Sequence, residues 1–350
     1  MPCIARSFIG HFFGHGSFRL MKQFVLAAAL LLIGAVAHAQ DYPPAPAMAG
    51  DVKIHDPSII VVDGHWVSFQ TGDQGGLYRG AIKLKISPDG INWTNAEAIG
   101  KGVPRWTRDV LKYTSQNIWA PSVSKHGDRL NLYYSVSMFG LNVSTIGLMT
   151  NDAFDPAKPG EGWVDQGEVL SSNARSDWNA IDPYRIDTSD GRAWLTYGSY
   201  WSGIKLRELD PATGKLLTPD TPVHDLAWYG GGVIEAPAII EREGSFYLFV
   251  SYDRCCAGVD STYRMMVGRA EAITGPYLGR DGTPLLQAGA SPLQAAMGRY
   301  LGPGGQEPVA GVADRFVYHY YDGDDLGVAK LQIVPLNWTA DGWPELSPPP

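Results

Sequence analysis

The pattern of apolar and polar positions along the chain predicts many short β-strands and little helix. Apolar or aromatic runs of four or five residues, such as 58–62, 130–134 and 246–249, are separated by Gly, Asp and Pro. Outside residues 24–36, no long stretch has the spacing of apolar positions that an amphipathic helix requires. The 41 glycines, 25 prolines, 17 tyrosines and 11 tryptophans also favour an all-β protein with frequent turns.

An internal repeat organises these strands. Five times, a motif ending in proline is followed six or seven residues later by a turn Gly or Asp, and then by a second strand. The prolines are spaced by 64, 62, 54 and 71 residues, which indicates a repeated supersecondary unit. The five motifs are His55-Asp56-Pro57, Trp119-Ala120-Pro121, Ile181-Asp182-Pro183, Glu235-Ala236-Pro237 and Gln306-Glu307-Pro308.

A β-propeller explains this repeat best, with each repeat forming one four-stranded blade. A two-sheet sandwich is the rival fold, but five evenly spaced copies exceed what one sandwich needs. We therefore predict an all-β, five-bladed β-propeller over residues 51–346. The proline motifs precede the innermost strands, so their acids are expected to meet at one mouth of the central channel. These acids are Asp56, Asp182, Glu235 and Glu307.

The first 39 residues do not resemble part of a propeller. A cationic start at Met21 is followed by an apolar block and then by Ala37-His38-Ala39, which is the pattern of a secretory signal peptide. We expect cleavage after Ala39 and a secreted or periplasmic protein. The predicted segments are a misassigned upstream start at 1–20, a signal peptide at 21–39 and an N-terminal linker at 40–50.

The predicted mature chain is acidic. Loss of residues 1–39 removes Arg6, Arg19 and Lys22 and changes the formal net charge from −8 to −11. Such a charge argues against a nucleic-acid partner, which favours a basic face. No second apolar run is long enough to span a bilayer. We expect a monomer that has no membrane attachment after cleavage.

Two cysteines remain in the predicted mature chain, the adjacent Cys255 and Cys256. A disulfide between neighbours is strained, because one trans peptide bond holds their Cα atoms closer together than disulfide geometry prefers. Two buried free thiols and one strained bridge both stay open, and the buried thiols are the favoured interpretation.

Converging carboxylates suit the hydrolysis of a glycosidic bond, in which one acid protonates the leaving oxygen and one carboxylate activates water. A single Asp-Pro pair is more often a turn element. Here, however, acids occupy matching places in several repeats, whereas Trp119-Ala120-Pro121 shows that the fold does not require an acid there. Chemistry is therefore the better explanation for Asp56, Asp182 and Glu235.

Taken in order, the motifs resemble those of arabinanases in glycoside hydrolase family 43. The resemblance implies a five-bladed propeller, an inverting mechanism and α-1,5-linked arabinan as substrate. It makes Asp56 the general base, Glu235 the general acid, and Asp182 a residue that tunes the pKa of the acid and orients the substrate. The residues that carry it are the motifs around Asp56, Trp119 and Glu235, Trp178-Asn179-Ala180-Ile181-Asp182-Pro183, Gly198-Ser199-Tyr200-Trp201, and Cys255-Cys256 with Ser261-Thr262-Tyr263.

Aromatic side chains beside these motifs are candidates for stacking on furanose rings. They are Trp119, Phe139, Trp178 and Trp201, and packing between blades is the alternative role for each. The resemblance further implies that the substrate site is lined by Gly140, Asn179, Ser199, Tyr200 and Trp201.

The resemblance places His319 on the central axis, beside a Ca²⁺ ion held largely by water. Because Ca²⁺ prefers oxygen ligands, one imidazole can only complete a mostly hydrated shell. The segment Gly302-Pro303-Gly304-Gly305-Gln306 departs from the Gly-x-Gly-His-Asn of many relatives, and Ser122 stands where Asp is frequent. For Glu307 the resemblance gives no role, so we expect a turn or surface residue.

We expect an endo-acting enzyme that cleaves internal bonds of arabinan, with several alternatives open. An exo-acting arabinanase, an arabinofuranosidase or a β-xylosidase would use the same acids with one end of the groove blocked by a loop. A non-catalytic sugar-binding propeller, or one that binds proteins, would not need the three acids, all of which this chain keeps.

Overall fold

In the computed structural model, which describes residues 42–72, 80–100 and 102–350, nearly all regular structure is β-strand. Residues Tyr42–Pro350 form one compact unit. The predicted upstream segment 1–20 and signal peptide 21–39 lie outside the described residues.

The strands of the described residues form five sheets, one for each predicted repeat. The first sheet contains β1 (Ala49–Gly50), β2 (Ser58–Val62), β3 (His65–Gln70), β4 (Ile82–Ser87) and β5 (Asn92–Ile99). The second contains β6 (Trp119–His126), β7 (Arg129–Val136), β8 (Ser144–Asn151) and β9 (Val164–Ser172). The third contains β10 (Tyr184–Asp187), β11 (Ala193–Tyr197), β12 (Ile204–Leu209) and β13 (His224–Ala227).

The fourth sheet contains β14 (Ile234–Arg242), β15 (Ser245–Tyr252), β16 (Arg264–Ala270) and β17 (Ser291–Gln294). The fifth contains β18 (Tyr300–Pro308), β19 (Arg315–Asp322), β20 (Val328–Trp338) and β21 (Pro344–Leu346). In the part of the chain that the structure describes, three short helical segments lie between strands: α1 (Trp106–Leu111), η1 (Gly258–Asp260) and η2 (Leu285–Gln287).

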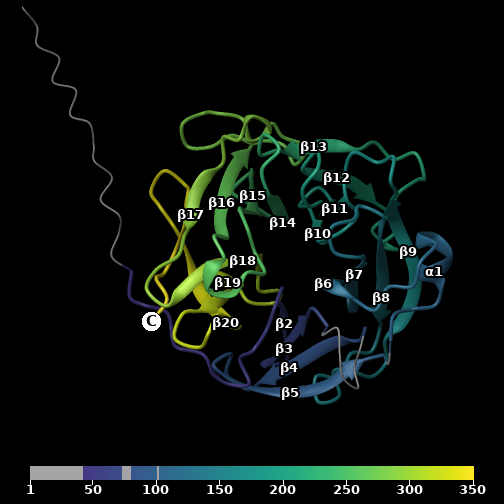
Figure 1. Cartoon of the computed structure of the whole chain (residues 1–350), viewed down its shortest axis with the longest axis horizontal. Helices are drawn as coiled ribbons and strands as arrows, with labels where there is room; N and C mark the ends of the chain where they lie inside the picture. Colours follow the sequence, from purple (N-terminus) through teal and green to yellow (C-terminus); the bar gives the residue numbers. More distant parts are fainter. Residues whose placement is uncertain (1–41, 73–79, 101) are drawn as a thin grey trace, which may run out of the picture. The chain divides into compact units, whose positions relative to one another are not determined.

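The sheets are arranged around a common centre, with β2, β6, β10, β14 and β18 innermost (Figure 1). Successive strands of each blade are antiparallel, whereas the short β1 pairs in parallel with β5 at the rim. The arrangement confirms the predicted all-β, five-bladed β-propeller.

Apolar side chains fill the spaces between neighbouring blades, in five buried clusters. One cluster, for example, joins Phe69 of the first blade to Leu132 of the second, and another joins Leu206 of the third to Leu248 of the fourth. Full burial of one such side chain stabilises the fold by about 1.5–3 kcal/mol. Successive side chains of a strand therefore point to opposite faces of the blade, and each face packs against a neighbouring blade.

The ring closes between the first and fifth blades through hydrogen bonds as well as packing. The Ile54 N–H donates to the Ala329 carbonyl at 3.0 Å, and the Leu331 N–H donates to the Val52 carbonyl at 2.9 Å. Nearer the channel, the Ala310 N–H donates to the Ile59 carbonyl at 2.9 Å. We call this junction the seam.

The described part of the predicted N-terminal linker at 40–50 contacts the propeller. Residues 49–50 form β1, and Ala45 is 3% exposed with its N–H donating to the Pro348 carbonyl at 2.8 Å. The segment is held because a small apolar side chain and an unpaired backbone donor both find partners on the propeller.

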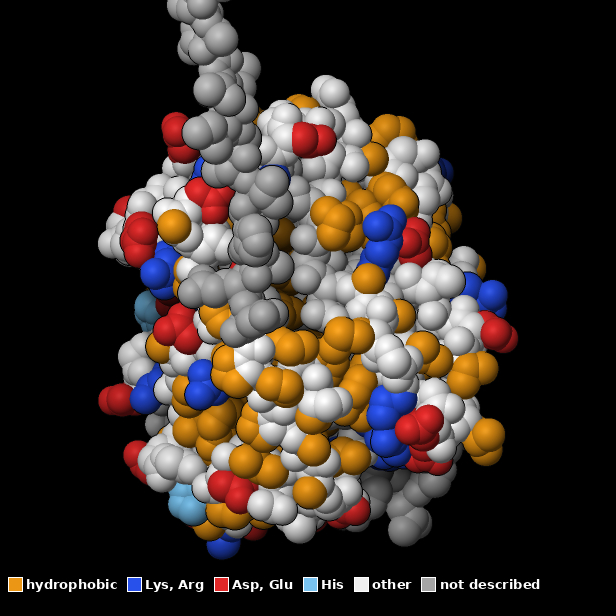
Figure 2. All heavy atoms as spheres, turned by 90° about the vertical axis from the view of Figure 1, so that its left-hand side faces the viewer, with side chains coloured by type: hydrophobic (Ala, Val, Ile, Leu, Met, Phe, Trp, Pro, Cys, Tyr) orange, Lys and Arg blue, Asp and Glu red, His pale blue; other side chains and the backbone are white. Residues whose placement is uncertain are grey.

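The outer surface carries charge of both signs. Figure 2 shows Lys and Arg side chains interspersed with Asp and Glu on the face in view, without a continuous basic patch. Among the described residues, helices are all too short and too polar to cross a bilayer.

Candidate active site

The proline motifs meet at the channel as a ring of left-handed residues, one from each blade. Their φ angles are 48° at Asp56, 41° at Ala120, 55° at Asp182, 51° at Ala236 and 61° at Gly305. Left-handed backbone costs a residue other than glycine about 1–2 kcal/mol. Four such residues in one ring therefore need support from their surroundings, and strain of this kind clusters at functional sites.

The support comes from side chains of the preceding blade, which accept hydrogen bonds from the backbone N–H groups of the ring residues. Asp56 donates to His319 Nδ1 at 3.2 Å, and Ala120 donates to Thr71 Oγ1 at 2.9 Å. The N–H groups of Asp182 and Gly305 donate to Ser135 and Ser251 hydroxyls at 3.0 and 3.2 Å. Each left-handed residue is thereby fixed by a contact across a blade interface.

The third blade differs, because the residue that should accept is Gly198, whose N–H pairs with the Ile181 carbonyl and which has no side chain. Here Asp182 itself supplies the acceptor, and its Oδ2 receives the Ala236 N–H at 3.0 Å. One of the predicted catalytic acids thus also holds the residue that follows Glu235.

This ring shows the one-residue offset between the acids. Asp56 and Asp182 are left-handed ring residues themselves, whereas Glu235 precedes the ring residue Ala236. The channel cavity is lined by the ring and the residues beside it: Asp56, Pro57, Ala120, Pro121, Ser122, Asp182, Pro183, Ala236, Pro237, Gly305, Gln306 and Glu307.

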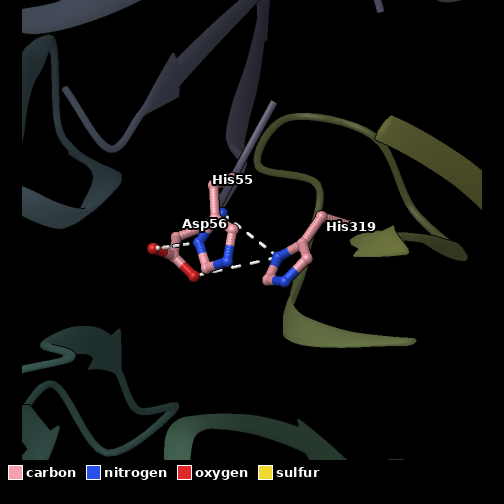
Figure 3. Close-up of side chains that lie close together, drawn as sticks. All are labelled: His55, Asp56 and His319. Carbon is pink, nitrogen blue, oxygen red and sulfur yellow. Dashed lines mark hydrogen bonds and ion pairs between the residues drawn. The ribbon is translucent and has the colours of Figure 1, made fainter. Parts of the chain in front are cut away.

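Asp56 is held as a carboxylate by two neighbours. His55 Nδ1 lies 2.9 Å from Asp56 Oδ2 (Figure 3). The Thr71 hydroxyl donates to the same oxygen at 2.5 Å. Burial alone would raise the pKa of Asp56, but the charge and hydrogen bond of His55 outweigh it and hold the pKa well below its usual range. Asp56 is therefore ionised at neutral pH.

Glu235 and Asp182 have the opposite tendency. Burial raises the pKa of Glu235, although hydrogen bonds from Ser199 and Tyr263 counteract it. Burial and then repulsion from Glu235 raise the pKa of Asp182 well above its usual value. The two carboxyl groups therefore retain protons more strongly than Asp56, and burial contributes more than the predicted repulsion to the proton affinity of Glu235.

The two polar residues expected in the substrate site lie below the surface. The Ser199 hydroxyl donates to Glu235 Oε2 at 2.8 Å. Asn179 is 3% exposed, and its Oδ1 accepts from the Ser144 hydroxyl at 2.6 Å. Both side chains are thus placed to orient neighbouring polar groups.

The aromatic candidates divide into two groups. Phe139 is 75% exposed and adjoins the exposed, left-handed Gly140. Tyr200 and Trp201 are consecutive left-handed residues, each about two-fifths exposed. Trp119 and Trp178 are half-buried, and Trp178 packs edge-on against Tyr197 with ring centroids 5.3 Å apart.

Trp228 was not anticipated from the sequence. It is 40% exposed, and its indole N–H donates to the Trp201 carbonyl at 3.3 Å. Because it lies in the loop after β13, between two repeats, no motif drew attention to it.

The expectation of a turn or surface role for Glu307 is wrong. Glu307 lines the cavity, is 8% exposed and accepts from the Ser122 hydroxyl at 3.0 Å. Burial raises its pKa to about 8. The sequence motif is misleading here because the ring residue of the fifth blade is Gly305. Glu307 lies two residues after it, inside β18.

His319 stands in a column of rings. It is fully buried, 3.9 Å from the ring of His55 and 6.0 Å from that of Tyr263. Burial and the neighbouring His55 lower the pKa of His319 well below its usual value, so it is neutral. Among the described residues, its Nε2 has no hydrogen-bond partner.

This unpartnered nitrogen allows a limited fit to Ca²⁺. When Nδ1 accepts the Asp56 N–H, Nε2 carries the proton and cannot bind a cation. When Nδ1 carries the proton, it faces Asp56 Oδ1 at 3.8 Å and Nε2 is free to act as one ligand. The donors His55, Asp56 and His319 lie within 4.8 Å of one another, but water would have to supply most of the shell.

Cys255 and Cys256 lie beside the same column. Both cysteines are free, and their Sγ atoms are 2.8 Å apart. Cys255 is half-buried and Cys256 is exposed, so the favoured expectation of thiols holds, while that of burial does not. Cys256 Sγ is 3.7 Å from His55 Nε2, and its N–H donates to the Tyr321 hydroxyl at 2.7 Å.

An ionised carboxylate and two proton-retaining carboxyl groups at the mouth of a propeller, with exposed aromatic rings nearby, define the class of site that glycoside hydrolases use. Comparison with known proteins agrees. The family model described as "Glycosyl hydrolases family 43" matches residues 46–344. The chain belongs to this family and is a glycoside hydrolase.

Among its relatives, the chain is 39% identical to the extracellular endo-α-(1→5)-L-arabinanase 1 of Bacillus subtilis, over 85% of this chain and 88% of that protein. It is 34% identical to the extracellular exo-α-(1→5)-L-arabinofuranosidase ArbA of Cellvibrio japonicus, over 85% and 87% of the two chains. The solved endo-arabinanase of Bacillus licheniformis is similar with a TM-score of 0.78 and 40% identity, covering 85% of this chain and 99% of that one.

Proposed function

We propose that this protein is an inverting endo-arabinanase that cleaves internal α-1,5-L-arabinofuranosidic bonds. The observation that carries the proposal is the contrast in protonation at one channel mouth. Asp56 is held ionised by His55, whereas Glu235 and Asp182 are buried and keep their protons more strongly. The relatives named as arabinanases support the choice of arabinan.

In the proposed reaction, Glu235 gives its proton to the departing glycosidic oxygen. Asp56 takes a proton from a water molecule, which attacks the anomeric carbon from the opposite face and inverts its configuration. Afterwards Asp56 is protonated and Glu235 is ionised, so a proton must return to Glu235 before the next turnover.

Asp182 serves this cycle in two ways. Its Oδ2 holds the Ala236 N–H, which fixes the backbone next to Glu235. Repulsion between the two carboxyl groups also disfavours a state in which both are ionised. Asp182 therefore helps the Asp182–Glu235 pair to retain the proton that Glu235 must donate.

Arabinan would bind across the mouth on exposed rings. Phe139, Tyr200 and Trp201 offer apolar faces at low conformational cost, and Gly140, which has no side chain, lets the arabinan chain approach the backbone closely. The half-buried Trp119 and Trp178 would contribute their edges, with Asn179 and Ser199 orienting polar groups beneath.

The experiment is product analysis on linear arabinan, with the anomeric form of the new reducing end followed by NMR. We expect a ladder of oligosaccharides that appear first in the anomeric configuration opposite to that of the substrate. Release of single sugars alone would favour exo action, as in the Cellvibrio relative, and retention of configuration would remove the assigned roles of Asp56 and Glu235.

We further propose that Ca²⁺ is held by His319 Nε2, in the tautomer whose proton is on Nδ1 and which no longer accepts the Asp56 N–H, with water completing its shell. A bound cation would supply positive charge beside Asp56 and help to keep that carboxylate ionised.

For the cell, we propose export through cleavage after Ala39 and action outside the cytoplasm, in keeping with the two relatives named as extracellular. N-terminal sequencing of protein recovered from culture medium or periplasm should begin at Gln40.

A further inference from the structure

In the fifth blade, Gln306 occupies the place that a proline holds in the other four blades. It follows the ring residue Gly305, as Pro237 follows Ala236. Its side chain is 3% exposed, and the residue lines the channel cavity. Proline has no side-chain donor or acceptor, so this substitution adds an amide where the repeat otherwise has none.

Both ends of the amide have partners in the fourth blade. Oε1 accepts from the Ser251 hydroxyl at 2.7 Å, and Nε2 donates to the Ala236 carbonyl at 2.8 Å. A carbonyl can only accept, so Nε2 must face Ala236, and the orientation of the amide follows from its partners.

These contacts complete a clamp on the peptide units around Ala236. The Ala236 N–H is held by Asp182 of the third blade, and its carbonyl is held by Gln306 of the fifth. Ala236 is left-handed, with φ 51°, a conformation that an alanine leaves unless its surroundings prevent it. Glu235 is the preceding residue, so any rotation about Ala236 changes the direction in which Glu235 projects.

We propose that Gln306 is a positioning residue for Glu235, which fixes the backbone from which the proposed general acid reaches the leaving oxygen. The inference rests on the proposed function of Glu235 and deepens it. Since a misplacement of about 1 Å can lower turnover about 100-fold, loss of the Gln306 amide is expected to lower kcat on arabinan about tenfold.

A positioning role predicts a dependence on the leaving group that a purely structural role does not. A phenol of low pKa departs without a proton, whereas an alcohol of arabinan needs one from the acid. The variant is Gln306→Met, which keeps the length of the side chain and removes the amide. Its kcat/KM would be measured on arabino-oligosaccharides and on aryl arabino-oligosaccharides carrying dinitrophenol, nitrophenol or phenol.

Gln332→Met is the matched control. Gln332 is 1% exposed, and its Nε2 donates to the Pro46 and Ile333 carbonyls, each at 3.1 Å, at the outer strands. It therefore loses a buried amide of the same kind away from the channel. Ser251→Ala, which removes the hydroxyl that orients the Gln306 amide, provides a second variant should Gln306→Met fail to fold.

We expect Gln306→Met to lose about tenfold on arabino-oligosaccharides and less than about threefold on the dinitrophenyl substrate, with Ser251→Ala changed in the same direction and Gln332→Met unchanged. Equal losses on all leaving groups, or no loss at all, would overturn the inference. Glu235→Ala distinguishes failure of the proposed acid role of Glu235 from failure of the positioning role of Gln306. If that variant also lacks leaving-group dependence, the acid assignment itself fails; if it shows the dependence and Gln306→Met does not, only the role of Gln306 is lost.

Discussion

Two buried glutamates of neighbouring blades differ in what their surroundings allow. Glu235 precedes the ring residue of the fourth blade and contacts Ser199, which the exposed Tyr200 and Trp201 follow in sequence. Glu307 follows the ring residue of the fifth blade by two positions and contacts Ser122 inside the channel. Both have raised pKa values, mainly because of burial. A raised pKa therefore does not by itself mark the proposed general acid; the proposal for Glu235 also rests on its position next to the ring residue Ala236.

The largest expected effect is a difference in turnover between variants of Glu235 and Glu307. Glu235→Gln removes the proton donor and should lower kcat on arabinan by about 10²–10⁴-fold, the usual range for general acid catalysis. Glu307→Gln keeps the shape of the protonated acid and should stay within about threefold of the wild type. Steady-state kinetics on linear arabinan measures both.

Asp56→Ala is the companion variant, and it should lose turnover on the same scale as Glu235→Gln while remaining folded by circular dichroism. Near-normal turnover in Asp56→Ala or Glu235→Gln would contradict the assigned roles. A loss in Glu307→Gln as large as that in Glu235→Gln would erase the distinction between the two glutamates.

The second prediction concerns stability and isolates Glu307. The folded protein keeps the Glu307 proton up to a pKa of about 8, whereas the unfolded chain loses it near pH 4.3. Between these values the folded state binds more protons, so this group's contribution is full below about pH 4 and is lost as the pH rises through about 8. The free energy of unfolding of the wild type should fall relative to Glu307→Gln by up to about 1.4 kcal/mol per pH unit in this window.

Urea unfolding at pH 5, 6.5 and 8 measures this slope for both proteins. Parallel curves for the wild type and Glu307→Gln would show that Glu307 does not keep its proton in the folded state.

The third prediction concerns the metal proposed at His319, in the same blade as Glu307. Removing Ca²⁺ with a chelator should lower the Tm of the wild type by about 5 °C, because an ion at about 100 times its Kd stabilises a fold by about 2.7 kcal/mol. His319→Gln should not respond to chelation. Absence of calcium by metal analysis, together with an unchanged Tm, would remove this proposal.

The smallest expected effect lies at the cysteine pair. With glutathione disulfide as oxidant, Cys255 and Cys256 should pass two electrons and two protons to it and close into a disulfide, which lowers the mass by about two units. Because Cys256 touches His55 only through a weak sulfur contact, turnover should change about twofold. Cys255→Ser should show neither change; an unchanged wild-type mass would show that the thiols do not pair.

The propeller was predictable because short sequence motifs mark the turns and inner strands of its repeat. Asp63-Gly64 and Asp190-Gly191 mark hairpin turns, and the prolines mark the inner strands in four blades. In the fifth blade, Glu307-Pro308 resembles the motif but lies two residues past the ring position, as the left-handed Gly305 and the pairing of Gly304 with His319 show. Ala45 escaped prediction because one small residue in a proline-rich segment has no periodicity.

The site was predictable as far as residue identity carries it. Asp56, Asp182 and Glu235 come together because equivalent places in a ring are neighbours in space. The residues that hold these acids and the ring were less visible. Thr71, which donates to Asp56, directly follows the second strand of its blade, and Ser251, which accepts the Gly305 N–H, lies on such a strand. A hydroxyl at these places has no sequence signature, and the role of Gln306 became visible only once its place next to the ring residue Gly305 was known.

The seam has a consequence for how the protein is made. Asp56 belongs to the first blade to leave the ribosome, and His319, which accepts its N–H, belongs to the last. Asp182, Glu235 and Asp56 are all synthesised before residue 300, yet the fifth blade must dock on the first before the proposed base has its final surroundings. A chain whose translation stops before the fifth blade therefore carries all three acids without a closed ring, and we expect activity to appear only once the fifth blade has docked on the first.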